Sequence, residues 1–147
     1  MRVVVQKSLD ASVIVNDHLI NKINGGLVVL VGFTEGDNET VINKMIQKIT
    51  KLRIFEDENN VMNLSVLDVN KEILAISQFT LYGNPYNGNR PSYIEALNPN
   101  DAKILYDYFI KECNKIVPTY PGVFGADMKV HLINDGPTTI IIDSVNF

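Results

Sequence analysis

The sequence predicts an α+β fold in which largely antiparallel, barrel-like β-sheets pack against two main α-helices. Strand-like segments outnumber helical ones and mostly follow one another directly, which favours antiparallel pairing. Two longer segments place apolar residues at helical spacing. The chain has 147 residues, of which 46% are hydrophobic and 20% are charged. We therefore expect a single folded domain that spans residues 1–147.

Strands are expected first in the N-terminal third, at residues 2–7, 11–15, 18–23 and 27–33, with "ND" and "NGG" as turn sequences. The run "LVVLVGF" at 27–33 is almost entirely apolar, which indicates a strand buried on both faces. Later strands are predicted for "EILAISQFTLYG" and for the two segments that flank "NDGPTT".

The two helices are predicted within residues 36–55 and 98–117. Each has apolar residues three or four positions apart and polar residues between them. Asp37 or Asn38 is the expected N-cap of the first helix, and Asn98 or Asn100 that of the second. Prolines that follow the second helix are expected to end it.

Composition limits the function. The net charge of −4 argues against a broad basic surface, so we expect no DNA partner and only local contacts with RNA. No apolar run approaches the ~20 residues that span a membrane, which makes the cytoplasm the expected location and excludes a membrane partner. Cys113 is the only cysteine, so neither an intrachain disulfide nor a cysteine zinc cluster is possible.

Titratable side chains do not suggest a catalytic group. His18 and His131 have no Ser or Cys partner nearby in sequence, and we interpret both as surface residues. Asp57 and Glu58 fall in a polar loop, and Asp127 fits a turn. We therefore expect no metal and no cofactor.

Two short motifs are less ordinary. On a strand, "SQFTLY" at 77–82 would mix polar and apolar side chains on each face, which is unusual for a core strand. "NDGPTT" at 134–139 has the Asp-Gly pair of a hairpin turn, followed by a proline that suits such a turn poorly. Taken alone, both fit a structural role better, because strand-end Ser and Thr often bond backbone groups and cis prolyl bonds are only ~5–6% of the total.

Together, the two motifs resemble the paired signatures of D-aminoacyl-tRNA deacylases, Ser-Gln-x-Thr and Asn-x-Gly-Pro-x-Thr. Other segments also resemble that family in their usual order: "ASVIV", "GLVVLVGF", "RIFEDEN", "MNLSV", "GNRPSY" and "FGADMKVHLINDGP". The resemblance implies a hydrolase that cleaves the ester of D-aminoacyl-tRNA, and of mischarged glycyl-tRNA, without a cofactor. Lys7 departs from the family, since Arg is common at that position.

The resemblance also implies roles for the first motif. The terminal adenosine of the tRNA would lie beside Ser77, Gln78 and Thr80, which would orient the substrate. Backbone N–H groups around Phe79 and Thr80 would stabilise the oxyanion. The 2′-hydroxyl of the RNA would help to activate water, which suits a labile ester and a chain with no visible triad.

For the second motif, the resemblance implies selection against L-amino acids. The peptide bond between Gly136 and Pro137 would be cis, and the pair would reach into the pocket of the other subunit of a homodimer. Its carbonyls would hold the α-amino group and fill the space of an L side chain, so glycine could not be refused. Asn134 and Thr139 would hold this loop in place.

Three cations, Lys7, Arg90 and Lys129, are candidates for RNA contacts. Two alternatives to the RNA-assisted mechanism stay open. In one, Thr80 is a nucleophile. In the other, the chain is a non-catalytic module that binds tRNA or a synthetase.

Overall fold

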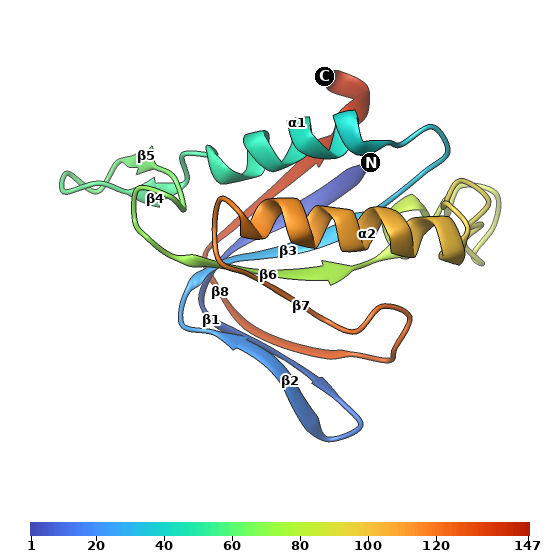
Figure 1. Cartoon of the computed structure of the whole chain (residues 1–147), viewed down its shortest axis with the longest axis horizontal. Coiled ribbons are helices and arrows are strands. Elements are labelled where there is room, and N and C mark those ends of the chain that lie inside the picture. Colours follow the sequence, from blue (N-terminus) through green and yellow to red (C-terminus); the bar gives the residue numbers. More distant parts are fainter.

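The computed structural model describes residues 1–147. Its main sheet has six strands: β1 (Arg2–Val15), β2 (His18–Ile23), β3 (Gly26–Gly32), β6 (Glu72–Ser77), β7 (Thr119–Pro121) and β8 (Lys129–Asp143). A small second sheet joins β4 (Phe55–Glu56) to β5 (Met62–Leu64). Two helices, α1 (Glu39–Thr50) and α2 (Pro99–Asn114), complete the fold. Figure 1 shows both helices lying side by side on one side of the main sheet.

The main sheet combines antiparallel and parallel pairing. β1 pairs antiparallel with β8 along one edge, and with β3 and then β2 along the other. β3 pairs in parallel with β6, and β6 with β7, because α1 and α2 lie in the connections between these strands. The sheet curls until β2 meets β7, where the Asn21 side chain donates a hydrogen bond of 2.7 Å to the Pro121 carbonyl. The predicted α+β, barrel-like class is confirmed.

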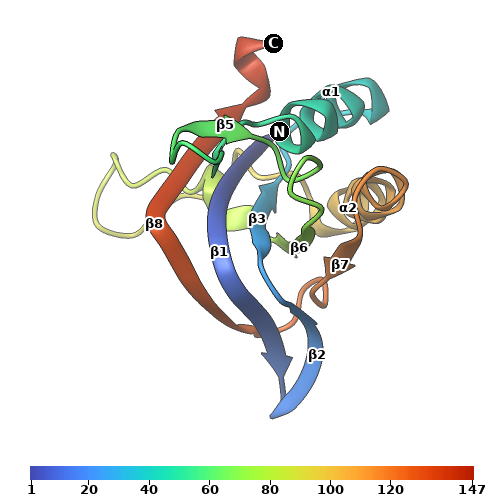
Figure 2. The same cartoon turned by 90° about the vertical axis from the view of Figure 1, so that its left-hand side faces the viewer.

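The structure contradicts the hairpin expected at "NDGPTT", because these residues lie within the single strand β8. Both halves of β8 run antiparallel to β1, with Asp143 opposite Arg2 and Lys129 opposite Ile14. A hairpin would have reversed the chain, whereas the two halves continue in one direction along the same partner. The strand bends near its middle (Figure 2), where residues 134–139 face only two steps of β1, from Gln6 to Ser8. "NDGPTT" is therefore a bulge within one long strand.

The helices begin at two of the predicted caps. The side chain of Asn38 accepts a hydrogen bond of 3.1 Å from the Val41 N–H, and that of Asn98 accepts one of 3.1 Å from the Asp101 N–H. Their apolar faces pack on the sheet around β3, which is buried on both sides as expected. The other side of the sheet encloses a smaller cluster inside the curl: Ala11, Val13, Ile23, Val28, Leu74 and Ile76.

The strand predicted over 72–83 ends at Ser77. The Gln78 N–H still donates to the Val31 carbonyl at 2.7 Å, but residues Phe79–Tyr82 then form a single 3₁₀ turn. We call Ser77–Tyr82 the Ser-Gln turn. The alternation of side chains between two faces, which is expected for a strand, does not apply to this turn, because its residues have 3₁₀ and not extended backbone geometry.

No helix of the protein is long and apolar enough to cross a membrane.

Candidate active site

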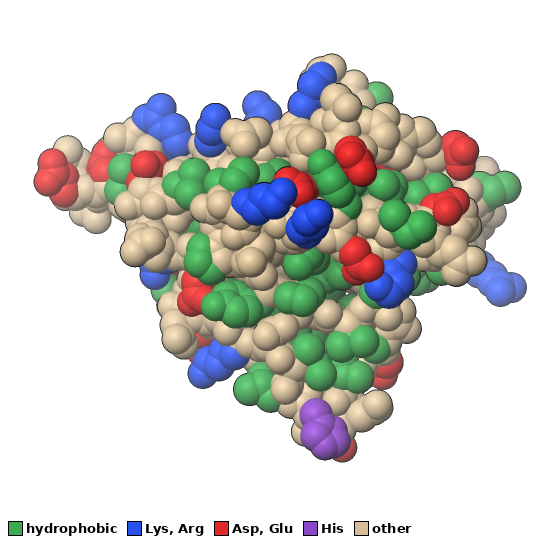
Figure 3. All heavy atoms as spheres, viewed as in Figure 1, with side chains coloured by type: hydrophobic (Ala, Val, Ile, Leu, Met, Phe, Trp, Pro, Cys, Tyr) green, Lys and Arg blue, Asp and Glu red, His purple; other side chains and the backbone are tan.

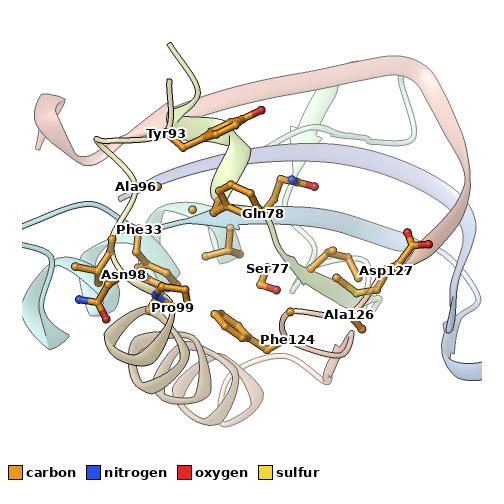
Figure 4. Close-up of a pocket in the computed structure, with 18 of the residues that line it drawn as sticks. Phe33, Ser77, Gln78, Tyr93, Ala96, Asn98, Pro99, Phe124, Ala126 and Asp127 are labelled. Atoms are coloured by element: carbon orange, nitrogen blue, oxygen red, sulfur yellow. The ribbon is translucent and has the colours of Figure 1, made fainter. Parts of the chain in front are cut away.

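A cavity of about 570 Å³ opens where β3 and β6 end (Figure 4). Ser77 lies opposite Val31 in the register of these strands, so the Ser-Gln turn begins at the cavity floor. The wall comes from distant segments, including the loop before α2 and the loop between β7 and β8. The aromatic and larger apolar wall residues are Phe33, Phe79, Tyr93, Leu97, Phe124 and Met128.

Few ionisable groups face this cavity. Tyr93 and Asp127 are the only lining residues with a titratable side chain. The Asp127 carboxylate is 86% exposed and lies 3.1 Å from Lys129 Nζ, so it has the character of a surface ion pair. Nor do His18 and His131 line the cavity. The site therefore offers an apolar surface and backbone groups rather than a paired acid and base.

Ser77, Gln78 and Phe79 of the Ser-Gln turn line the cavity, whereas Thr80 does not. The N–H groups of Phe79 and Thr80 begin the 3₁₀ turn, so neither has an acceptor within it. The Gln78 side-chain amide donates to Thr80 Oγ1. The Phe79 ring is 57% exposed and meets the Tyr93 ring edge-to-face, with centroids 5.1 Å apart. This pair forms an aromatic platform at the rim of the cavity.

Arg2 fixes the far end of the turn. Its guanidinium donates to the Leu81 carbonyl at 2.7 Å and to the Asp143 carboxylate at 2.7 Å, and it lies 4.7 Å from the centroid of the Tyr82 ring. Asp143 is the last residue of β8. The Ser-Gln turn is thus joined to the ends of both long strands.

Tyr106 supports the floor from below. Its hydroxyl, buried on α2, donates to the Ala75 carbonyl at 2.7 Å, two residues before Ser77. The same carbonyl accepts from the Gly122 N–H at 3.1 Å. The Tyr106 ring also packs near Phe124, with centroids 5.8 Å apart. The floor and one wall are therefore held by one buried side chain.

Residues 134–139, which we call the Gly-Pro segment, form the bulge of β8. The Gly136–Pro137 peptide bond is cis, and Gly136 has a φ of 118°. The Asn134 amide is best oriented with its oxygen 3.0 Å from Thr139 Oγ1 and its nitrogen 3.0 Å from the Lys7 carbonyl. Thr139 Oγ1 also lies 3.2 Å from the Pro137 carbonyl oxygen. The four residues expected to act together at this motif are therefore neighbours.

Lys7, one of the three cations expected as candidates for RNA contacts, lies beneath the Gly-Pro segment. The side chain is only 3% exposed, because Lys7 points into the protein from β1. Its ammonium donates to both Glu56 carboxylate oxygens, at 2.7 and 2.9 Å, and lies 3.5 Å from the Asp135 carboxylate. The hydrogen bond from Lys7 lowers the pKa of Glu56 below its ordinary value. Lys7 therefore ties the Gly-Pro segment to β4.

The two other cations remain on the surface. Arg90 is exposed in the loop that follows the Ser-Gln turn, and Lys129 is exposed at the start of β8 beside Asp127. Cys113 is fully buried, and burial raises the pKa of its thiol to about 11, which suits an inert side chain. No group of three or more His, Cys, Asp or Glu side chains is arranged to hold a metal ion.

The fold does not bring the two motifs together in one chain. The Gly-Pro segment faces Gln6 and Ser8, and these residues pair with the beginning of β3 at Val28 and Gly26. The cavity lies at the other end of β3, at Val31 and beyond. Val28 and Gly32 are four residue steps apart along the strand, which is about 13 Å.

Sequence reasoning missed most of the cavity wall. Leu97, Phe124 and Met128 carry no reactive group, and the phenol of Tyr93 has no neighbour in the sequence that would mark it, so no chemical pattern singles these residues out. Only the family resemblance pointed to part of this wall. The segment "GNRPSY" ends at Tyr93 and "FGADMKVHLINDGP" begins at Phe124, and both of these residues line the cavity.

Comparisons with known proteins agree with this geometry. The family model described as D-Tyr-tRNA(Tyr) deacylase matches residues 4–143. A D-aminoacyl-tRNA deacylase from Flavobacterium psychrophilum is 53% identical, with 99% of both chains covered. One from Clostridium tetani is 52% identical, with 98% of this chain and 97% of the relative covered.

Two solved structures share the fold. The c-Myc DNA Unwinding Element Binding Protein superposes with a TM-score of 0.92 at 38% identity, covering 97% of this chain and 98% of the other. A probable eukaryotic D-amino acid tRNA deacylase superposes with a TM-score of 0.83 at 16% identity, covering 96% and 97%, and this likeness concerns the fold alone.

The fold and the match over nearly the whole chain define a hydrolase of aminoacyl-tRNA. The chain belongs to the D-Tyr-tRNA(Tyr) deacylase family. Its enzymatic class is that of the D-aminoacyl-tRNA deacylases.

Proposed function

We propose that the protein hydrolyses the ester of D-aminoacyl-tRNA and of mischarged glycyl-tRNA in the cytoplasm, with catalysis assisted by the 2′-hydroxyl of the terminal adenosine. The observation that carries this proposal is the Ser-Gln turn at the floor of an apolar cavity with no acid–base pair. The adenine stacks on the platform of Phe79 and Tyr93. The backbone N–H groups of Phe79 and Thr80 stabilise the oxyanion.

Ser77, Gln78 and Thr80 orient the substrate and do not attack it. Thr80 Oγ1 accepts from Gln78, and no histidine lines the cavity to activate either hydroxyl. The nearest general base is then the ribose of the substrate itself. Because the ester is intrinsically labile, positioning and oxyanion stabilisation supply most of what the reaction needs.

Selection against L-amino acids falls to the Gly-Pro segment of a second copy of the chain. Within one chain this segment lies at the far end of the sheet from the cavity. β8 is an edge strand, paired only with β1, and its Ile133 and Ile141 are 54% and 69% exposed. Such an edge suits a homodimer in which each copy lends Gly136 and Pro137 to the other's cavity.

In that arrangement, the segment occupies the space of an L side chain and its carbonyls hold the α-amino group. A D side chain points away and is accepted. Glycine has no side chain to be refused, so glycyl-tRNA is cleaved too. Asn134 and Thr139 keep the segment in position through the contacts described above.

A deacylation assay with matched substrates tests this function. We expect rapid hydrolysis of D-tyrosyl-tRNA and glycyl-tRNA, and release from L-tyrosyl-tRNA no faster than the spontaneous rate. The measurement is the remaining aminoacyl-tRNA against time, with sedimentation to establish the dimer. Equal rates for the D and L esters would contradict rejection by the Gly-Pro segment. Binding of tRNA without hydrolysis of any ester would favour the non-catalytic module.

Replacing Gly32 by alanine tests the position of the Ser-Gln turn. A Cβ at Gly32 would lie 2.9 Å from the Gln78 carbonyl oxygen and 3.1 Å from Leu81 Cβ, so the turn must shift. We expect kcat/KM for D-tyrosyl-tRNA to fall roughly 10- to 100-fold, since small misplacements at a reacting centre have effects of this size. Gly36→Ala is the control, because Gly36 lies outside the cavity and a Cβ there meets nothing within 4 Å, so its φ of 87° costs stability without moving the turn. If Gly32→Ala left kcat/KM unchanged, the proposed role of the Ser-Gln turn in positioning the substrate would be contradicted.

A further inference from the structure

Outside the cavity, the surface of α1 carries an unusual concentration of positive charge. Figure 3 shows Lys and Arg side chains along the edge of the molecule formed by this helix. The protein as a whole has a net charge of −4, so this concentration is local. A shallow hollow of about 440 Å³ lies among these side chains, lined by Lys44, Gln47, Lys48, Lys51, Leu52 and Arg53.

Helix geometry places these residues in one row. Lys44, Gln47, Lys48 and Lys51 are three or four residues apart, so they share one face of α1 and extend over about 10 Å. The opposite face is buried in the core. Arg53 continues the row beyond the end of the helix. We call these five residues the basic stripe.

The cations of the basic stripe are free to bind an anion. No carboxylate lies within 4.0 Å of the charged groups of Lys44, Lys48, Lys51 or Arg53. The neighbouring acidic side chains accept hydrogen bonds within their own loops, and hydrogen bonds from Ser65 together with the nearby charge of Arg53 lower the pKa of Asp68. Asp57 accepts from the N–H groups of its own loop, at 2.9 and 3.1 Å, and Asp68 accepts from the Ser65 N–H at 2.8 Å.

Helix stability explains only part of the stripe. A cation in the last turn of a helix is favoured by the helix dipole, which accounts for Lys48 and Lys51. Lys44 lies more than a turn from the helix end, and Arg53 lies outside the helix. Arg53 also has a structural role, since its Nε donates a hydrogen bond of 2.8 Å to the Asn63 carbonyl. Lys44 has no acidic partner, so its alignment with the other cations has no such structural reason.

The basic stripe and the Gly-Pro segment lie at the same end of the protein. Arg53 is three residues before Glu56, and the Glu56 carboxylate receives Lys7, which also faces Asp135. Figure 1 draws β4, β5 and the end of α1 at one end, and the yellow loop beside the cavity at the other. A dimer in which the Gly-Pro segment reaches into the second copy's cavity would bring this end of the protein, and the stripe with it, toward that cavity.

We propose that the basic stripe on α1 binds the sugar-phosphate backbone of the tRNA whose 3′ end occupies the second copy's cavity. This inference rests on the proposed function. A row of unpaired lysines fits the regularly spaced phosphates of an RNA strand and makes no demand on base sequence. An acidic protein thus gains local affinity for a long polyanion at the stripe, and the cavity still decides which ester is cleaved.

The test compares a long and a short substrate. Lys48→Gln with Lys51→Gln is measured on D-tyrosyl-tRNA and on a short single-stranded RNA of the same 3′-terminal sequence with the same ester. We expect KM for the full tRNA to rise roughly 5- to 20-fold near 0.1 M salt. The slope of log KM against log salt concentration should fall by about one to two, because fewer counterions are released on binding. KM for the short RNA should stay within twofold. Lys22→Gln with Lys115→Gln removes the same charge elsewhere and should change neither value.

Two results would overturn the inference. Equal KM for the full tRNA in the variant and the unaltered protein would show that the stripe makes no contact. An equal rise for both substrates would show an effect on the cavity. Binding of uncharged tRNA, measured across salt concentrations, gives a second readout: the stripe variant should bind more weakly, and unchanged binding counts against the stripe. Failure of the unaltered protein to cleave either ester would instead contradict the proposed function.

Discussion

A D-tyrosyl-tRNA that ends in 2′-deoxyadenosine is expected to resist hydrolysis, with a rate at least ~10²-fold below that of the ordinary substrate. The cavity has no histidine and no buried carboxylate that could replace the missing hydroxyl. The ester and the adenine are unchanged, so the modified tRNA should still bind. Single-turnover hydrolysis measures the loss, and competition against the ordinary substrate measures the binding.

Thr80→Ala is the companion experiment. Because Thr80 Oγ1 is engaged by the Gln78 side chain and has no base beside it, we expect the variant to keep most of its activity on the ordinary substrate. A folded Thr80→Ala protein with no turnover would identify Thr80 as a nucleophile. Rapid cleavage of the deoxy substrate would likewise contradict catalysis by the RNA.

Gly26→Ala is expected to lower the free energy of unfolding by about 2–6 kcal/mol, a large part of the ~5–15 kcal/mol that typical domains possess. A Cβ at Gly26 would lie 1.9 Å from the Glu72 carbonyl oxygen, and the φ of 141° disfavours any L side chain. The clash falls on the first residue pair between β3 and β6, and this pairing places Ser77 opposite Val31.

Urea unfolding of both proteins measures the difference. Gly36→Ala is the matched control, because Gly36 also has a positive φ, 87°, but a Cβ there meets nothing within 4 Å. We expect the control to lose much less stability than Gly26→Ala. Similar losses in the two variants would show that backbone strain, and not the contact with Glu72, sets the cost.

Local signals in the sequence predicted the elements well. Asn38 and Asn98 begin the helices because a side-chain oxygen is needed where the first N–H groups have no partner. The apolar run of β3 is buried on both faces. These features depend on residues close together in the chain, so a single sequence contains them.

Contacts between residues far apart in the chain were harder to predict from the sequence. Whether the residues after Ile133 reverse or continue depends on β1, more than a hundred residues earlier, and not on the Asp135–Gly136 pair. The end of the strand at Ser77 similarly depends on the space beside Gly32 and on Arg2, which holds the Leu81 carbonyl. Proximity of Lys7 to Glu56 and Asp135 is likewise set by the fold.

The candidate site was predicted through resemblance more than through chemistry. Ser77, Gln78, Phe79 and Thr80 are ordinary residues, and the proposed use of backbone donors and a substrate hydroxyl would leave little trace in residue types. The apolar wall leaves even less, because its members satisfy the same packing preferences as a core.

β8 is anchored to β1 on both sides of its bulge, so the segment proposed to choose the substrate lies between two independently paired parts of the strand. Val130 and Leu132 on one side, and Ile140 and Ile142 on the other, each face their own partner on β1. The residues between them can therefore be exchanged without moving either register. Under the proposed function, small local changes in this segment would alter the stereochemical preference, while the cavity at the other end of β3 would stay as it is.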